Sequence, residues 1–278
     1  MKHRFHQLDV FSAVPLKGNP LAVVHAAAAL GTATMAAFAR WTNLSETTFL
    51  LPPSPGVAAD YRVRIFTPGG ELPFAGHPTL GSCHAWLAAG GVPRDGGCVV
   101  QECGVGLVRV RRQGARLAFA APPLRRTGPL APALQQQIVA ALGLQAGDVL
   151  HGQWVDNGPG WCAVMLRSAA QVLALQPDAA RLGDLKLGVV GAQPPGQDTL
   201  FEVRAFVPGL GVPEDPVTGS LNAGLAQWLI GAGLAPPQYV AAQGAALGRA
   251  GRVFVEQQAG EIWVGGDVAG CIDGTVEL

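Results

Sequence analysis

The sequence predicts an α+β protein made of two similar domains, each a sheet wrapped around its own buried helix. Three observations lead to this prediction. A motif rich in proline and glycine occurs once in each half of the chain. A helical segment without Asp, Glu, Lys or Arg follows the motif both times. Short segments rich in β-branched residues precede and follow each helix, and glycine (38) and proline (22) are spread along the 278 residues, which is typical of many turns between short strands.

The repeat is clearest between "FTPGGELPFAGHPTLGS" (66–82) and "FVPGLGVPEDPVTGS" (206–220). At an offset of 140 residues the matches are Phe66 with Phe206, Pro68 with Pro208, Gly69 with Gly209, and Pro73 with Pro213. At an offset of 142 they are Trp86 and Leu87 with Trp228 and Leu229, Gly91 with Gly233, and Gln101 with Gln243. The chain has only six tryptophans, so the tryptophan match favours an internal duplication.

Both halves are expected to contain the same elements in the same order. The first half is predicted to have strands at 60–66, 97–112 and 116–120 and a helix at 79–89; the second half, strands at 200–206, 252–257 and 261–266 and a helix at 220–232. A helix that is apolar all round must be buried on all sides, so we expect only the N-terminal ends of the two helices to open outward. Gly81 and Gly224 are expected to allow close backbone approach.

The segment 121–132, rich in proline and basic residues, is the predicted linker. It gives a first domain at 1–121 and a second at 122–278, with a last strand that can return to the first domain.

Composition excludes several kinds of partner. Lys plus Arg and Asp plus Glu each number 19, so the net charge is zero and nucleic acid is not an expected partner. Five cysteines without a Cys-x-x-Cys pair predict neither a disulfide framework nor a zinc site. The N-terminus lacks a signal-peptide core, and the apolar run 21–31 is too short to span a bilayer. A cytoplasmic protein without membrane contact is therefore expected.

The N-terminal ends of the two uncharged helices are candidate anion sites, because the first amides of a helix lack partners and carry partial positive charge. Gly76 and His77 precede the first helix; Asp215 precedes the second, and Gly219 and Ser220 stand at its start. If both ends face one cleft, they could hold a small carboxylate between them. No metal site is expected, since His77 and His84 lack a third ligand at suitable spacing.

Each of these residues also has a structural interpretation. Ser220 and Thr79 could be N-caps, and Asp215 could only complement the helix dipole. His77 could donate to a nearby carbonyl group.

Glu46 is the third candidate ionisable group. It stands in "WTNLSETTFLL" (41–51), where a helix is predicted to pass into a buried strand. A half-buried glutamate at such a junction would have a raised pKa and could shuttle protons. The alternative is an exposed acid at the end of a helix.

Four motifs together resemble the phenazine-biosynthesis PhzF-like isomerase family: "GNPLAVV" (18–24), "NLSETTF" (43–49), "FTPGGELPFAGHPTLGS" (66–82) and "PEDPVTGSLNAG" (213–224). The resemblance covers both halves in order. It implies the diaminopimelate epimerase-like fold, with two pseudo-symmetric domains that each wrap a barrel-like, mostly antiparallel sheet around a central helix. It also implies an active site between the domains, a homodimer and no cofactor.

Carried over by motif, the resemblance implies that Glu46 is the acid/base and that His77 and Asp215 are polar groups on the other side of the substrate. Gly76, Gly219 and Ser220 match the anion-binding turns. The implied reaction is a cofactor-independent proton shift on a small carboxylate, which leaves the substrate itself open.

Two other functions remain open from the sequence. Related epimerases and racemases use a thiol in each helix-end loop, but those positions are Ala75 and Asp215 here, which disfavours a two-thiol racemase. A non-catalytic protein that binds a small carboxylate is the third hypothesis, and it predicts ligand binding without turnover.

Overall fold

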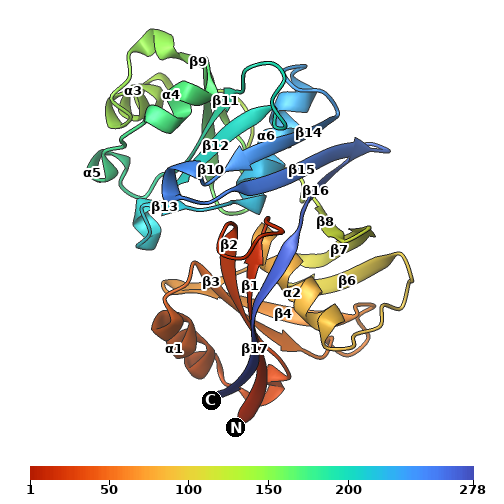
Figure 1. Cartoon of the computed structure of the whole chain (residues 1–278). Helices are drawn as coiled ribbons and strands as arrows, with labels where there is room; N and C mark the ends of the chain where they lie inside the picture. The colour runs from red at the N-terminus through yellow and green to blue at the C-terminus, as the bar shows by residue number, and fades with distance from the viewer. The chain divides into compact units, whose positions relative to one another are not determined.

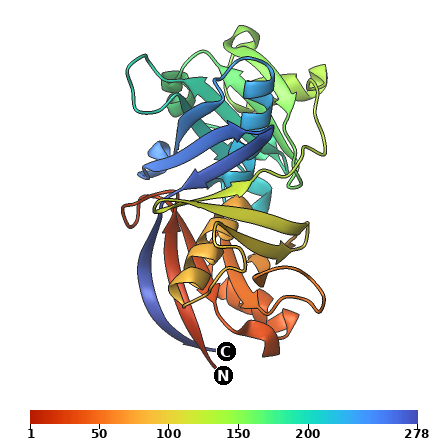
Figure 2. The ribbon, with the colours of Figure 1, turned by 90° about the vertical axis from the view of Figure 1, so that its right-hand side faces the viewer.

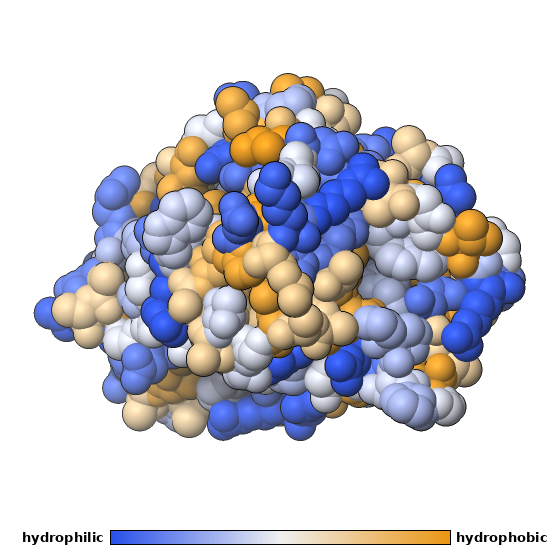
Figure 3. Space-filling model, turned by 90° about the horizontal axis from the view of Figure 1, so that it is seen from below, coloured by the Kyte–Doolittle hydropathy of each residue, from blue (hydrophilic) through white to orange (hydrophobic).

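The computed structural model describes all 278 residues, and the chain divides into two compact units. Unit 1 consists of residues 1–120 and 265–278, and unit 2 of residues 121–264 (Figure 1). No helix is both long and apolar enough to cross a membrane. On the face shown in Figure 3, hydrophobic and hydrophilic residues are intermixed.

Unit 1 is a mixed sheet around one long helix. The strand pairs β2–β3 and β4–β6 are parallel, whereas β1–β17, β1–β2, β3–β4, β4–β5, β6–β7 and β7–β8 are antiparallel. The C-terminal strand pairs with the N-terminal strand along its length, and Figure 2 shows them side by side. The elements are β1 (Lys2–Val10), β2 (Asn19–Val24), η1 (Ala27–Ala29), α1 (Thr32–Thr42), β3 (Glu46–Leu51), β4 (Tyr61–Thr67), β5 (Gly70–Leu72), α2 (Gly76–Ala88), β6 (Cys98–Cys103), β7 (Gly106–Gln113), β8 (Arg116–Ala120) and β17 (Val268–Glu277).

Unit 2 repeats this arrangement around α6, with parallel pairs β10–β11 and β12–β14. Strand β16 crosses the boundary between the units and leads into β17. The elements are α3 (Pro132–Ala141), η2 (Ala146–Asp148), β9 (Val149–Trp154), β10 (Trp161–Leu166), α4 (Ala169–Ala174), α5 (Ala179–Leu182), β11 (Lys186–Ala192), β12 (Phe201–Phe206), η3 (Pro208–Leu210), β13 (Glu214–Asp215), α6 (Gly219–Gly231), β14 (Gln238–Gln243), η4 (Ala245–Leu247), β15 (Gly251–Gln258) and β16 (Glu261–Gly266).

The sequence repeat is also a repeat of strand register. In unit 1, Leu21 of β2 pairs with Glu46 of the parallel strand β3. The residues 140 positions later, Trp161 of β10 and Lys186 of β11, form the equivalent parallel pair in unit 2. The antiparallel pair Thr47–Phe66 likewise corresponds to Leu187–Phe206. Since paired strands in both units keep the offset found in the sequence, the two units are copies of one topology.

The central helices are buried as predicted, with one correction. Their N-terminal residues are buried, whereas the last turns are the exposed parts, so the expectation that only the N-terminal ends open outward is wrong. A Cβ on Gly81 would lie 2.4 Å from Leu21 Cδ2, and one on Gly224 would lie 2.2 Å from the carbonyl oxygen of Val155. These two glycines therefore allow the close approach that the sequence predicted.

Each unit contains the same arginine–glutamate pair at a different depth. Arg64 donates from Nε and Nη2 to Glu71 (2.7 and 2.6 Å), and Arg204 donates in the same way to Glu214 (2.9 and 2.7 Å). In unit 2, the segment 172–175 supplies two more carbonyl acceptors for Arg204, and both charged side chains are under 10% exposed. In unit 1 the glutamate is 40% exposed.

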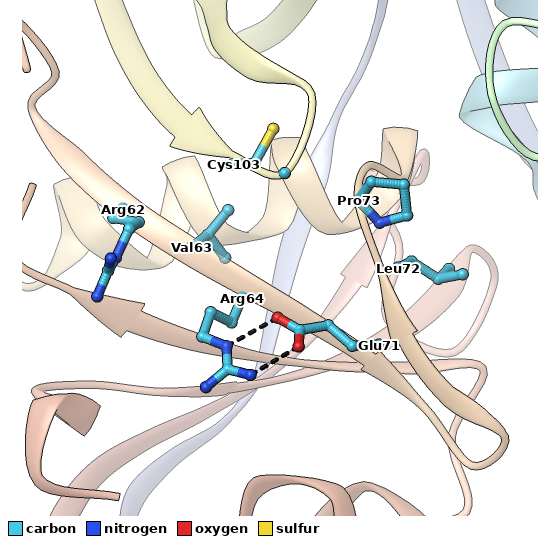
Figure 4. Close-up of a pocket in the computed structure, with 8 residues that line it drawn as sticks. Arg62, Val63, Arg64, Glu71, Leu72, Pro73 and Cys103 are labelled. Atoms are coloured by element: carbon cyan, nitrogen blue, oxygen red, sulfur yellow. Dashed lines mark hydrogen bonds and ion pairs between the residues drawn. The ribbon is translucent and has the colours of Figure 1, made fainter. Parts of the chain in front are cut away.

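The unit 1 pair lies beside a cavity of about 560 Å³ (Figure 4). Strand β4 pairs with β6 at its start and with β5 at its end, and the cavity lies where the two partners separate. None of the predicted site residues lines it.

A histidine pair in unit 1 predicts a dependence of stability on pH. His25 Nε2 lies 2.8 Å from His6 Nδ1, and burial, followed by the charges of His6 and Arg4, lowers the pKa of His25 from 6.5 to about 4. A buried group with a lowered pKa stabilises the fold above its unfolded pKa, and this contribution is lost as the pH falls from about 6.5 toward 4.

We therefore expect the free energy of unfolding in urea to fall between pH 7.5 and pH 5, with His25 accounting for about 1–2 kcal/mol. His25→Gln keeps a polar partner for His6 and should show a smaller fall over the same interval. If the free energy of unfolding depended equally on pH in the parent and the variant, His25 would not be the cause of the fall.

Candidate functional site

Glu46 is the first residue of β3, and the preceding turn fixes its position. Helix α1 ends where Asn43 adopts a left-handed conformation (φ 53°) and donates its N–H to Ala39. Three residues later β3 begins beside Leu21 of β2, and the rest of β3 is buried. The Glu46 side chain is 14% exposed, so the interpretation as an exposed acid at a helix end does not hold.

His77 lies next to Glu46 in unit 1. It is the second residue of α2, its side chain is 3% exposed, and its Nε2 lies 3.4 Å from Glu46 Oε2. Burial lowers the pKa of His77 to about 3, opposed by the backbone carbonyl of Pro20. The imidazole is therefore neutral near pH 7 and can act as a hydrogen-bond donor without carrying charge.

Asn19 lies beside the His77 imidazole and bears on its tautomer. Asn19 Nδ2 is 3.3 Å from His77 Nδ1, and Ser45 Oγ is 3.5 Å from Asn19 Oδ1. With the amide oxygen facing the Ser45 hydroxyl, the amide nitrogen donates to Nδ1. This orientation of Asn19 suits the tautomer that carries the His77 proton on Nε2, the atom that faces Glu46, whereas the Pro20 carbonyl is a competing acceptor for the imidazole proton.

The first turn of α2 has no side-chain cap. Its N-cap is Ala75 in an extended conformation, and the Thr79 hydroxyl donates back to the Ala75 carbonyl at 2.9 Å. The interpretation of Thr79 as an N-cap is therefore wrong. Gly76 and His77 are the first two helical residues, so their amides belong to the uncapped end of the helix.

In unit 2, Asp215 ends the short strand β13 and pairs with Ala205 of β12. Thr218, the N-cap of α6, makes no cap bond through its side chain. Its hydroxyl instead donates to Asp215 Oδ2 at 2.5 Å. Asp215 is thus tied to the start of α6 by a direct hydrogen bond.

Gly219 and Ser220 are the first two residues of α6. The Ser220 hydroxyl accepts from Trp161 Nε1 (3.0 Å), and its carbonyl accepts from Asn157 Nδ2 (2.8 Å). Ser220 therefore is not the N-cap, because that position belongs to Thr218. Its place in the helix corresponds to that of His77 in α2.

The two units have the same strand register but hold different residues at equivalent positions. The register that places Glu46 beside Leu21 places Lys186 beside Trp161. Lys186 donates to the Pro159 carbonyl (2.7 Å), and burial lowers its pKa. The acid of unit 1 thus has a lysine as its counterpart in unit 2.

Within unit 1 the structure brings together Glu46, His77 and Gly76, and within unit 2 Asp215, Gly219 and Ser220. Sequence reasoning did not assign a role to Asn19, Thr218 or Gln243. Asn19 and Thr218 belong to the quoted motifs, and Gln243 is matched with Gln101 in the repeat, so a signal was present for each. No group of three or more His, Cys, Asp or Glu side chains is arranged to hold a metal ion.

The buried thiols are poor candidates for proton transfer. Cys83 lies inside α2, where burial raises its pKa, and burial raises the pKa of Cys162 to about 12. Neither sulfur would be ionised near neutral pH.

Comparison with known proteins gives consistent results across the chain. The model of the family described as phenazine biosynthesis-like protein (PhzC-PhzF) matches residues 8–271. Antisense-enhancing sequence 1 of Schizosaccharomyces pombe is 36% identical and covers 98% of this chain and 98% of that protein. Trans-2,3-dihydro-3-hydroxyanthranilate isomerase of Pseudomonas aeruginosa is 35% identical, covering 93% and 92%. The crystal structure of a PhzF family protein from Enterococcus faecalis has a TM-score of 0.82, with 25% identity and complete coverage of both chains, which confirms the predicted fold class.

Proposed function

We propose that this chain, which belongs to the phenazine biosynthesis-like protein family and is an isomerase, moves a proton on a small carboxylate without a cofactor. The observation that carries the proposal is the pair formed by Glu46 and a neutral, buried His77 at 3.4 Å, next to the uncapped end of α2. A carboxylate beside a neutral donor suits removal of a proton from carbon and its return to another atom.

In this mechanism the Glu46 carboxylate takes a proton from a carbon of the substrate, exchanges it with solvent, and later delivers a proton to a different carbon. The reaction changes no oxidation state overall, so it needs no electron carrier. His77 donates its Nε2 proton in a hydrogen bond and steadies the negative charge that develops on the substrate. The amides of Gly76 and His77 hold the substrate carboxylate, which the helix dipole attracts.

Asp215, Gly219 and Ser220 are proposed to contribute a second set of polar groups to the same reaction. Asp215 would orient a hydroxyl or amino group of the substrate, and the amides at the start of α6 would bind an anionic group. The proposed substrate class is a cyclic carboxylate with such substituents, because the Pseudomonas aeruginosa relative is named for a dihydro-hydroxyanthranilate.

The test is to supply trans-2,3-dihydro-3-hydroxyanthranilate and other small ring carboxylates in heavy water and to follow deuterium entering carbon by NMR. Deuterium at a carbon distinct from the one that loses its proton is expected. Ligand-induced stabilisation without exchange for any of them would instead indicate a protein that only binds carboxylates.

A two-thiol epimerase is the less supported alternative, since the helix-end positions hold Ala75 and Asp215 and the buried thiols have raised pKa values. Activity that is insensitive to a thiol alkylating reagent would separate the two reactions. We also propose that the enzyme is a cytoplasmic homodimer, in keeping with the resemblance and with only 14% charged residues; light scattering after gel filtration would measure the mass.

A further inference from the structure

Gln243 is buried at the end of β14 (1% exposed), and its side-chain amide makes four hydrogen bonds near the start of α6. Its Oε1 accepts from the Thr218 N–H (3.0 Å) and from Asn222 Nδ2 (2.9 Å). Its Nε2 donates to the Thr218 hydroxyl (3.0 Å) and to the Asp215 main-chain carbonyl (3.2 Å). Two donors and two lone pairs are all that a glutamine amide offers.

The direction of every bond in this group is fixed by the backbone. A peptide N–H can only donate, so the atom that faces the Thr218 N–H must be the amide oxygen of Gln243. The amide nitrogen then faces the Thr218 hydroxyl and donates to it. That hydroxyl has one proton, and its remaining hydrogen bond is to Asp215 Oδ2 at 2.5 Å. The proton therefore points to the carboxylate.

We propose that Gln243 is a positioning residue that acts through Thr218 to hold Asp215 ionised and in one rotamer. An O–H group that donates to a carboxylate favours its charged form and restricts its side-chain torsions. The inference rests on the proposed function in one respect only, namely that Asp215 takes part in the reaction.

Unit 1 contains a built-in comparison. Gln101, which matches Gln243 in the repeat, accepts from the Tyr61 hydroxyl (2.9 Å) and donates to the Thr79 hydroxyl (3.1 Å). Thr79 then donates to the Ala75 carbonyl. A glutamine–threonine relay thus ends on a peptide carbonyl in unit 1 and on a carboxylate in unit 2, although Thr79 is the fourth residue of α2 and Thr218 is the N-cap of α6. Only the second relay contacts a carboxylate.

Other charged residues lie near the group formed by Gln243, Thr218 and Asp215. Glu214 of β13 pairs with Arg204 of β12 at 2.7 Å. Arg249 lies in the turn after β14, where a Cβ on Gly244 would meet both its side chain and the Pro216 carbonyl. The variants below leave these charges unchanged, so a shift in the titration of Asp215 reports the loss of the relay.

The experiment is a pH titration of Asp215 by carbon NMR in the full-length protein labelled at aspartate carboxyl carbons, with the resonance identified from Asp215→Asn. Thr218→Val removes the hydroxyl at nearly constant volume. Gln243→Leu removes the amide that donates to the Thr218 hydroxyl. Both are expected to shift the titration of Asp215 to higher pH by about one unit. Thr218→Ser keeps the hydroxyl and should titrate like the parent.

Gln101→Leu is the matched control, because it removes the unit 1 relay and should leave the Asp215 titration unchanged. An unshifted titration in Thr218→Val, or an equal shift in Gln101→Leu, would overturn the proposal.

Turnover separates the positioning role from the proposed function. Thr218→Val is expected to lower kcat about tenfold with little change in KM, and to move the acidic limb of the pH–rate profile to higher pH, with recovery in Thr218→Ser. A shifted NMR titration with unchanged turnover would support the anchoring by Gln243 and overturn the participation of Asp215 in the reaction.

Discussion

Glu46→Gln is expected to slow proton transfer by about 10²- to 10⁴-fold. The amide has nearly the shape of the carboxylate, and the residue is the first of a buried strand, so the fold should persist. The amide cannot accept a proton from carbon, whereas it can still lie beside His77 Nε2 (3.4 Å in the parent). The loss should therefore appear in kcat, with the substrate affinity changed only a few fold.

The measurement is single-turnover deuterium incorporation into substrate carbon, combined with substrate-induced change in the melting temperature as the measure of binding. Glu71→Gln is the control, because this acid of unit 1 is paired with Arg64 and is 40% exposed. Exchange in Glu46→Gln at the rate of the parent would exclude Glu46 as the acid/base. Loss of both exchange and binding would place its main effect on substrate affinity.

Glu214→Gln is expected to lower the free energy of unfolding by about 3–5 kcal/mol, because it leaves the guanidinium of Arg204 buried without its counter-charge. Both side chains of this pair are under 10% exposed. The two backbone carbonyls that also accept from Arg204 supply no charge and cannot replace the carboxylate.

The duplicate pair in unit 1 provides the comparison for this prediction. Glu71→Gln removes the same bidentate contact to an arginine, but solvent reaches both groups, so the expected cost is under about 1 kcal/mol. Urea denaturation of the two variants under the same conditions measures both values. Equal losses would show that depth of burial does not set the strength of these pairs.

Much of the fold could be predicted because the strands and the central helices have local sequence patterns, and these patterns occur in both halves of the chain. The strand expected at 60–66 is β4 (Tyr61–Thr67), and its counterpart at 200–206 is β12 (Phe201–Phe206). The two helices are found where the uncharged segments predicted them. Helix α2 begins at Gly76 rather than at residue 79, and α6 begins at Gly219 rather than at residue 220. What the pattern could not provide is the burial of the helix ends, since this depends on packing rather than on hydrophobic periodicity.

The site was predictable only in part, for a physical reason. Glu46 and His77 carry ionisable groups and stand in short motifs, so each could be proposed from the sequence. Gln243 lies 28 residues after Asp215 and reaches it only because β14 pairs with β12, which no local pattern reveals. The capping error had a similar origin: the hydroxyl of Thr79 and that of Ser220 are engaged by distant partners, Gln101 and Trp161.

The return of β17 to unit 1 has a consequence for synthesis on the ribosome. Strand β1 forms first, but its antiparallel partner is the last strand to emerge, after all of residues 121–264. At about 5–20 residues per second, translation of residues 121–264 alone would keep the edge of β1 open for roughly 7 to 30 seconds. An open edge is a template for pairing with other chains, so the nascent protein is most prone to aggregation while its second unit is being translated.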